Sequence, residues 1–111
     1  MASTPPFAVS WMPRCRELVA EWVQRAIALK APQPLARFLS AVERELRTNP
    51  REWGDPIRNH PNLKLVEYAH TNAADRFRVY YLVHDDQSVV FVREIVLIEG
   101  NPLRGTNGQP G

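Results

Sequence analysis

One stretch, residues 75–98, constrains the fold of this chain more than any other. It contains two apolar runs, Phe77 to Val83 and Val89 to Ile98, joined by the polar residues 84–88. Both runs are rich in valine, isoleucine, phenylalanine and tyrosine, which fit a half-buried strand. The connection has the length of a hairpin loop, so the stretch predicts a β-hairpin. A hairpin needs cover from another part of the chain to be stable.

Two amphipathic helices are predicted to supply this cover. Apolar residues recur at helical spacing from residue 14 to about residue 30, and again from residue 34 to residue 47. Pro32 and Pro34 separate the two segments, because proline cannot continue the hydrogen-bond ladder of a helix. The short link therefore predicts an antiparallel helical hairpin. A further helical turn is expected at residues 51–53.

Two shorter strands complete the predicted sheet. Residues 7–11 alternate large apolar and small side chains, and residues 63–68 alternate loosely. Residues 54–61 are interpreted as a polar connection, and residues 70–75 as a turn-rich link. The predicted order is β-α-α-β-β-β. It corresponds to an α+β domain with a helical hairpin on one face of a small, mainly antiparallel, four-stranded sheet.

The length of 111 residues is that of one domain. We expect a flexible N-terminus at residues 1–6, a single domain at residues 7–102, and a flexible tail at residues 103–111, which are rich in glycine, proline, asparagine and glutamine. No segment approaches the roughly 20 apolar residues of a membrane span. Residues 1–6 lack the basic and apolar regions of a signal peptide. The sequence therefore predicts a cytoplasmic location and no membrane partner.

The sequence shows no pattern typical of a metal site, an internal disulfide or a cofactor site. The chain has one cysteine, Cys15, and three histidines that lie apart without the spacing of metal ligands. Cys15 is interpreted as a small apolar residue at the start of the first helix. His84 lies beside two aspartates, which is typical of a turn. A net charge of +2 permits contact with nucleic acid without indicating it.

Residues 77–81, Phe-Arg-Val-Tyr-Tyr, precede an acidic turn and a valine-rich strand at residues 89–93. Together with the order of elements over residues 7–98, this pattern resembles the RelE/ParE superfamily of toxins from toxin–antitoxin systems. The resemblance implies a cognate antitoxin that wraps the toxin surface. It also implies one of two targets: RelE-like members cleave mRNA on the ribosome, and ParE-like members act on DNA gyrase.

Cleavage of RNA requires a base, an acid and stabilisation of the charge on the phosphorane. The resemblance places the candidate catalytic side chains at basic positions, namely Arg78, Arg93, Lys64 and Arg76. A charge inside an apolar strand needs a partner. For Arg93, the candidates are Glu67 and Glu94 on neighbouring strands.

The C-terminal region departs from the pattern of RelE-like nucleases, which place a catalytic tyrosine or histidine there. Residues 96–107 contain neither, and Arg104 is the basic residue that this region retains. This departure favours a second hypothesis, a non-catalytic interaction module on the same fold. Its candidate binding residues are Tyr80, Tyr68, Leu82 and Arg104, since apolar side chains on a free sheet face mark interfaces. A third hypothesis, simple nucleic-acid binding, predicts a steep dependence of affinity on salt.

Overall fold

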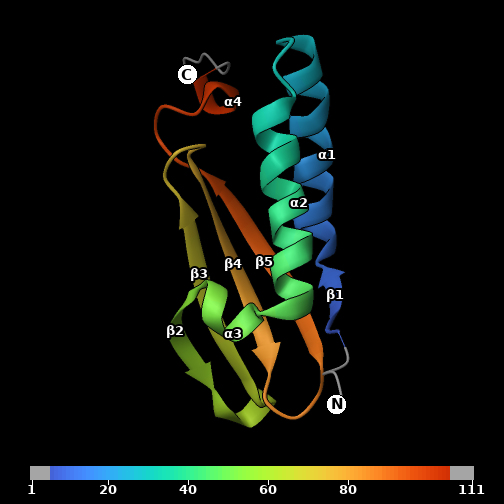
Figure 1. Ribbon diagram of the computed structural model, residues 1–111, viewed down its shortest axis with the longest axis vertical. Coiled ribbons are helices and arrows are strands. Elements are labelled where there is room, and N and C mark those ends of the chain that lie inside the picture. Colours follow the sequence, from blue (N-terminus) through green and yellow to red (C-terminus); the bar gives the residue numbers. More distant parts are fainter. Residues whose placement is uncertain (1–5, 106–111) are drawn as a thin grey trace.

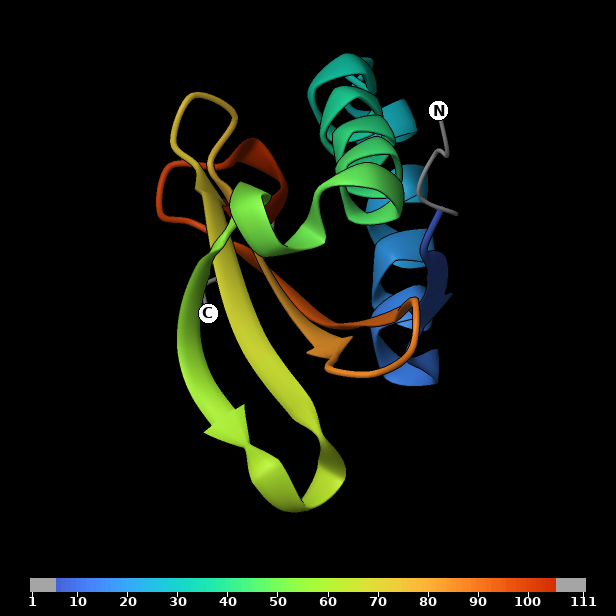
Figure 2. The same ribbon diagram turned by 60° about the horizontal axis from the view of Figure 1, so that its bottom comes forward.

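Two layers, one of helices and one of strands, make up the computed structural model, which describes residues 6–105 (Figure 1). The strands are β1 (Ala8–Trp11), β2 (Asp55–His60), β3 (Leu65–Asn72), β4 (Phe77–His84) and β5 (Val89–Leu97). The helices are α1 (Pro13–Ala28), α2 (Gln33–Thr48), the short α3 (Pro50–Trp53) and α4 (Pro102–Gly105), and a 3₁₀ turn, η1, spans Pro61–Leu63. Both long helices lie on the same side of a strongly curved sheet (Figure 2).

The sheet has the order β1-β5-β4-β3-β2. Strands β2 to β5 form antiparallel pairs, and β1 runs parallel to β5. The predicted hairpin is confirmed: β4 and β5 are neighbours, with Phe77 opposite Leu97 and Val83 opposite Val90. The α+β class is confirmed as well. The number of strands was wrong, because the described residues form five and the prediction had four.

The additional strand is β2, which lies in the segment interpreted as a polar connection. Its side chains are exposed except for that of His60, which is half-buried. The segment therefore lacks the apolar alternation by which a strand is recognised in a sequence. Backbone pairing with β3 makes it a strand. Its proline, Pro56, is tolerated because β2 is at the edge of the sheet.

The other predicted strand, residues 63–68, begins later and ends later than expected. Leu63 belongs to η1, and Lys64 adopts a left-handed conformation (φ 56°) that ends this turn. Strand β3 then continues to Asn72, through residues that were interpreted as part of a turn-rich link. The reason is the long partner strand β4, which pairs with β3 from His84 opposite Leu65 to Phe77 opposite Asn72.

The core lies between the helices and one face of the sheet. Alternate residues of β4 point into it, and four of them are buried: Phe77, Val79, Tyr81 and Val83. From α2, Phe38 stacks on Phe77 with ring centroids 4.7 Å apart. The two long helices match their predicted segments within about two residues. Each has a proline in its first turn, where a missing N–H costs no hydrogen bond.

The chain beyond β5 packs against the end of the helical hairpin. The Asn101 side chain is buried and donates hydrogen bonds to the carbonyl oxygens of Asp75 (3.2 Å) and Arg76 (3.0 Å). Arg25 of α1 donates to the carbonyl oxygen of Leu103 at 2.7 Å, and the Leu103 side chain is buried. Residues 103–105, predicted to start a flexible tail, thus belong to α4. The predicted flexible residues 1–5 and 106–111 lie outside the described residues.

Substitution of Gly54 by alanine is expected to destabilise the protein. The new methyl group would lie 2.6 Å from the Tyr81 hydroxyl oxygen and 2.9 Å from the Ala69 carbonyl oxygen. The hydroxyl cannot move freely, because it is buried and donates to the Pro50 carbonyl oxygen at 2.6 Å. We expect Gly54→Ala to lower the free energy of unfolding by about 1–3 kcal/mol in urea denaturation.

The matched background for this test is Tyr81→Phe, which removes the hydroxyl. In this background Gly54→Ala should cost less than in the wild type, because one of the two close contacts is gone. A urea midpoint for Gly54→Ala equal to that of the wild type would contradict the close approach.

Candidate functional site

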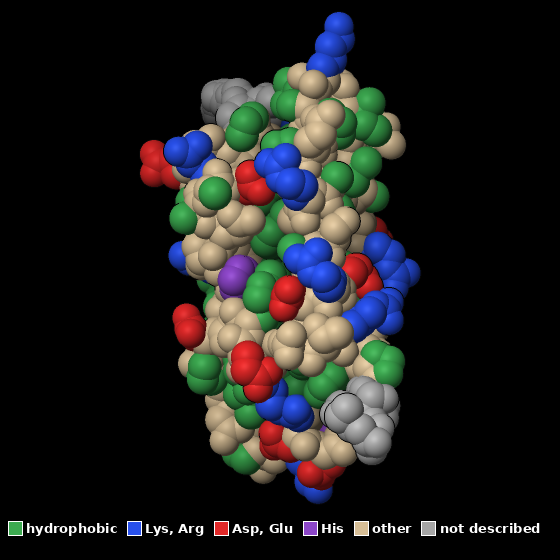
Figure 3. Space-filling model, in the orientation of Figure 1, with side chains coloured by type: hydrophobic (Ala, Val, Ile, Leu, Met, Phe, Trp, Pro, Cys, Tyr) green, Lys and Arg blue, Asp and Glu red, His purple; other side chains and the backbone are tan. Residues whose placement is uncertain are grey.

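The face of the sheet opposite the long helices, here called the outer face, carries the candidate site. Strand β4 contributes Arg78, Tyr80 and Leu82 to it, because their side chains alternate with the buried Phe77, Val79 and Tyr81. The opposite side, with α2 and α3, shows basic and acidic side chains interspersed (Figure 3). In this view, that side therefore shows no continuous patch of basic or of acidic side chains.

A hollow of about 260 Å³ opens on the outer face. Residues from β2, η1, β3, β4 and β5 line it: Arg58, His60, Leu63, Leu65, Glu67, Leu82 and Arg93. We call this hollow the outer pocket. Its lining combines three leucines with two arginines, one histidine and one carboxylate.

The Glu67 side chain is the centre of this group. It is only 3% exposed, and one carboxylate oxygen accepts a hydrogen bond from Arg93 Nε at 2.7 Å. The other oxygen lies 3.6 Å from Nε2 of His60, which forms an ion pair only when the imidazole is protonated. A buried carboxylate needs such partners, because its desolvation is costly. The predicted pairing of Arg93 with Glu67 and Glu94 is confirmed, the second contact measuring 3.6 Å.

Arg93 lies on the outer face at a β-bulge of β5. Tyr80 pairs with Glu94 and Tyr81 pairs with Val92, so Arg93 is the extra residue between them. Its guanidinium group lies over the ring of Tyr80, 5.4 Å from the centroid. The arginine is therefore held by a carboxylate and an aromatic ring.

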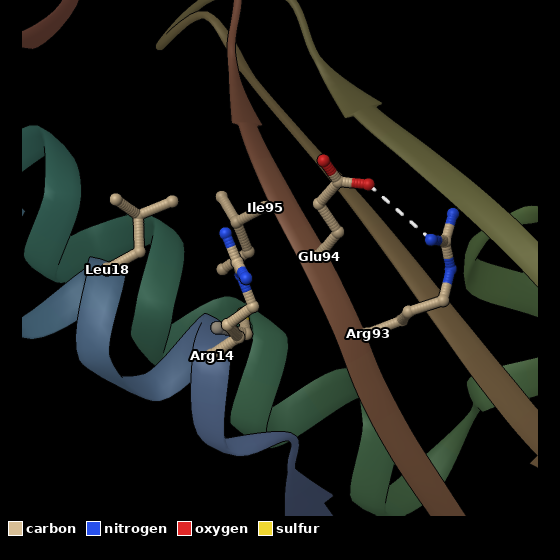
Figure 4. A pocket seen from close by; sticks show the side chains of 6 residues that line it. Arg14, Leu18, Arg93, Glu94 and Ile95 are labelled. Carbon is tan, nitrogen blue, oxygen red and sulfur yellow. Dashed lines mark ion pairs between the residues drawn. The ribbon is translucent and has the colours of Figure 1, made fainter.

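A second hollow, of about 330 Å³, lies between the first turns of α1 and β5. Figure 4 shows Arg14 and Leu18 on the helix, with Arg93 pointing away from both and Glu94 paired to it. Cys15 also lines this hollow, and the residue is 5% exposed. Arg93 thus separates the two hollows.

Cys15 behaves as a core residue, as predicted. Burial raises the pKa of its thiol above the ordinary value. Because the thiolate is the reactive form, we expect native protein to react with Ellman's reagent about 10-fold or more slowly than protein in guanidinium chloride. Equal rates in the two states would contradict this burial.

Comparison with known proteins identifies the fold. No model of a known protein family matches the sequence, and no curated protein matches it. The toxin–antitoxin complex RelBE2 of Mycobacterium tuberculosis matches with a TM-score of 0.61 and 15% identity, over 87% of this chain and 97% of the other. The isolated RelE toxin of E. coli matches with a TM-score of 0.56 and 17% identity, over 90% and 93%. The fold is that of a RelE toxin.

The four basic residues predicted as catalytic do not converge on this RelE fold. Lys64 precedes β3 at one end of the sheet and pairs with Asp86 at 3.0 Å. At the other end, Arg78 donates to the Thr71 hydroxyl at 2.9 Å, and Arg76 adopts a left-handed conformation (φ 65°) just before β4. Of the four, only Arg93 lines the outer pocket.

The residues predicted to bind a partner have different positions. Leu82 lines the outer pocket, although it is only 7% exposed, and Tyr80 is half-buried on the outer face. Arg104 is exposed in α4, outside the pocket lining. The prediction for Tyr68 was wrong: it lies on the helix side, 8% exposed, and stacks on Tyr81 with centroids 5.5 Å apart.

Sequence reasoning missed Arg58 and His60 as site residues. Both belong to β2, and without that strand nothing placed them on a sheet face. The other two histidines have structural roles in the RelE fold. His70 stacks on Trp53 with centroids 3.8 Å apart, and Nδ1 of His84 accepts hydrogen bonds from the N–H groups of Asp86 and Gln87. The prediction that His84 is a turn residue was wrong, because His84 is the last residue of β4 and only its side chain bonds to the turn that follows.

Residues 6–105 contain neither a cluster of metal ligands nor a helix that could span a membrane. No group of three or more histidine, cysteine or acidic side chains is placed to hold a metal ion in this part of the chain. None of its helices has both the length and the apolar character required to cross a membrane.

Proposed function

We propose that this chain is the toxin of a toxin–antitoxin module and that its outer face binds a macromolecular target without cleaving RNA. The RelE fold supports the first part. One of the similar structures is a complex of a toxin with its antitoxin, and the other is a toxin on its own. The proposal therefore includes a cognate antitoxin, and it locates both partners in the cytoplasm.

The dispersal of the basic side chains is the observation that supports binding over cleavage. Charge stabilisation in a phosphoryl-transfer site requires several cations directed at one point. Here Lys64 and Arg78 have their own partners near opposite ends of the sheet. The outer pocket instead combines leucine side chains with a partly neutralised Arg93. Such a mixed surface is typical of a protein interface. DNA gyrase, the target of ParE-like toxins, is a target of this class.

Inducible expression in bacteria tests the proposal. We expect growth to stop after induction, and co-expression of an antitoxin encoded by a neighbouring gene should restore growth. Mapping of mRNA 5′ ends before and after induction should show no new ends. Normal growth at a confirmed high level of folded protein would overturn the assignment as a toxin.

A second candidate function, cleavage of mRNA on the ribosome, is favoured by one observation. The outer pocket brings the imidazole of His60 together with the guanidinium groups of Arg58 and Arg93. An imidazole can transfer protons near neutral pH, and guanidinium groups can stabilise a charged phosphorane. New mRNA 5′ ends that vanish in a His60→Gln variant would establish this function in place of the first.

A further inference from the structure

The outer pocket has the size of a side-chain pocket. Its volume of about 260 Å³ lies below the roughly 300–1,000 Å³ of small-molecule sites. The lining includes Leu63, Leu65 and Leu82. Leu63 is 64% exposed. Exposed apolar side chains beside an apolar hollow favour an apolar group from another molecule as the occupant.

Among the charged residues around these leucines, one arginine has no negatively charged partner within residues 6–105. Glu67 is paired with Arg93, whose other neighbour is the exposed Glu94. Arg58 is exposed, and its side chain makes no ion pair or hydrogen bond within residues 6–105. Protonation of His60 would add a second positive charge. The charge that complements this lining is therefore negative.

Glu67 also determines which nitrogen atoms of Arg93 are available to bind another molecule. The carboxylate accepts from Nε, at the inner end of the guanidinium group. The two terminal amino groups of Arg93 remain accessible to another molecule. One of them lies 3.6 Å from a carboxylate oxygen of Glu94, and this contact is exposed to solvent. These amino groups can donate to a carboxylate from outside. Because Tyr80 supports the guanidinium group, little side-chain entropy is lost when it binds.

We propose that the outer pocket binds a segment of a partner protein in which a bulky apolar side chain adjoins an aspartate or glutamate. The apolar side chain enters among the leucines, and the carboxylate lies against Arg58 and Arg93. This inference rests on the proposed function and specifies the chemistry of its target.

An RNA strand fits the same surface less well. RNA affinity depends on neutralising many phosphates and on stacking bases on free aromatic rings. The buried carboxylate of Glu67 lies in the middle of the pocket, and the ring of Tyr80 is already occupied by Arg93. Both features disfavour the binding of a polyanion such as RNA. They are compatible with an occupant that has one carboxylate next to an apolar group.

Selection from a random library of displayed peptides on the immobilised full-length chain tests this inference. We expect the enriched peptides to share leucine, isoleucine, methionine or phenylalanine beside an acidic residue. The affinity of the best peptide, measured by fluorescence anisotropy, should fall about 10-fold in Arg58→Gln, the loss expected for one charge-assisted hydrogen bond. A peptide variant with asparagine or glutamine in place of the acidic residue should show a similar loss.

The matched control is Arg44→Gln, which removes an exposed arginine from α2 on the helix side and should leave peptide affinity unchanged. Enrichment of other motifs, no enrichment, or tighter binding of a polyuridine oligonucleotide than of any peptide would overturn the inference. The two proposals fail separately. Growth arrest without a selected motif leaves the toxin assignment intact, whereas a selected motif without growth arrest removes it.

Discussion

Combining Arg58→Glu with Arg93→Gln is expected to abolish growth arrest. The two changes turn the positive lining of the outer pocket negative, because Glu67 remains. Removal of one partner from a buried, hydrogen-bonded charge pair at an interface typically costs about 2–5 kcal/mol of binding free energy. Affinity for the target should therefore fall by about 30-fold or more. The measurement is colony number after induction, at equal protein level.

The control for this experiment is Arg44→Glu, which reverses one charge on the helix side of the molecule, as Arg58→Glu does on the outer face. It should arrest growth as the wild type does. Circular dichroism of both proteins is part of the test, because Arg93→Gln removes a charged partner of the buried Glu67, whereas Arg58 and Arg44 are exposed. The comparison of growth uses proteins that are shown to be folded. Full arrest by the folded outer-face variant would exclude the outer pocket from the function.

Substitution of Phe38 by alanine is expected to have the largest effect on stability. The side chain is 1% exposed and stacks on Phe77 between the two layers. Truncation of a buried phenylalanine costs about 3–5 kcal/mol through lost burial and an unfilled cavity. Small domains have total stabilities of about 5–15 kcal/mol, so much of the stability would be lost. Urea denaturation followed by tryptophan fluorescence measures the change.

Ile27→Ala provides the comparison, because this residue of α1 is apolar but 55% exposed. Its substitution should change the free energy of unfolding by less than about 0.5 kcal/mol. If the two variants lost equal stability, the sheet and the helices would not pack through Phe38.

The sequence was informative wherever burial left a periodic pattern. The long helices were predictable because their apolar residues recur at helical spacing, and the β4–β5 hairpin because its two runs are too apolar to be loops. The partner of Arg93 was predictable for a related reason. A charged residue in an apolar strand requires an opposite charge, and the sequence offered Glu67 and Glu94. Glu94 proved to be the next residue on β5, and Glu67 lies on β3, two strands away.

Where backbone pairing or register decided the structure, the sequence was not sufficient. Strand β2 is formed by hydrogen bonds to β3 and leaves no apolar pattern, so Arg58 and His60 could not be placed. Tyr68 was assigned to the wrong face because the register of β3 on β4 was unknown. It lies opposite Tyr81 and shares its face, whereas a shift of one residue would have put it beside Tyr80 or Leu82.

A scan of all single substitutions, scored in parallel for growth arrest and for protein abundance, tests most directly whether the outer face is the working surface. We expect the substitutions that relieve arrest without lowering abundance to cluster at the residues around the outer pocket, with Arg58, His60, Leu82 and Arg93 among them. A cluster on α1 and α2, or no substitution that separates arrest from abundance, would contradict the account.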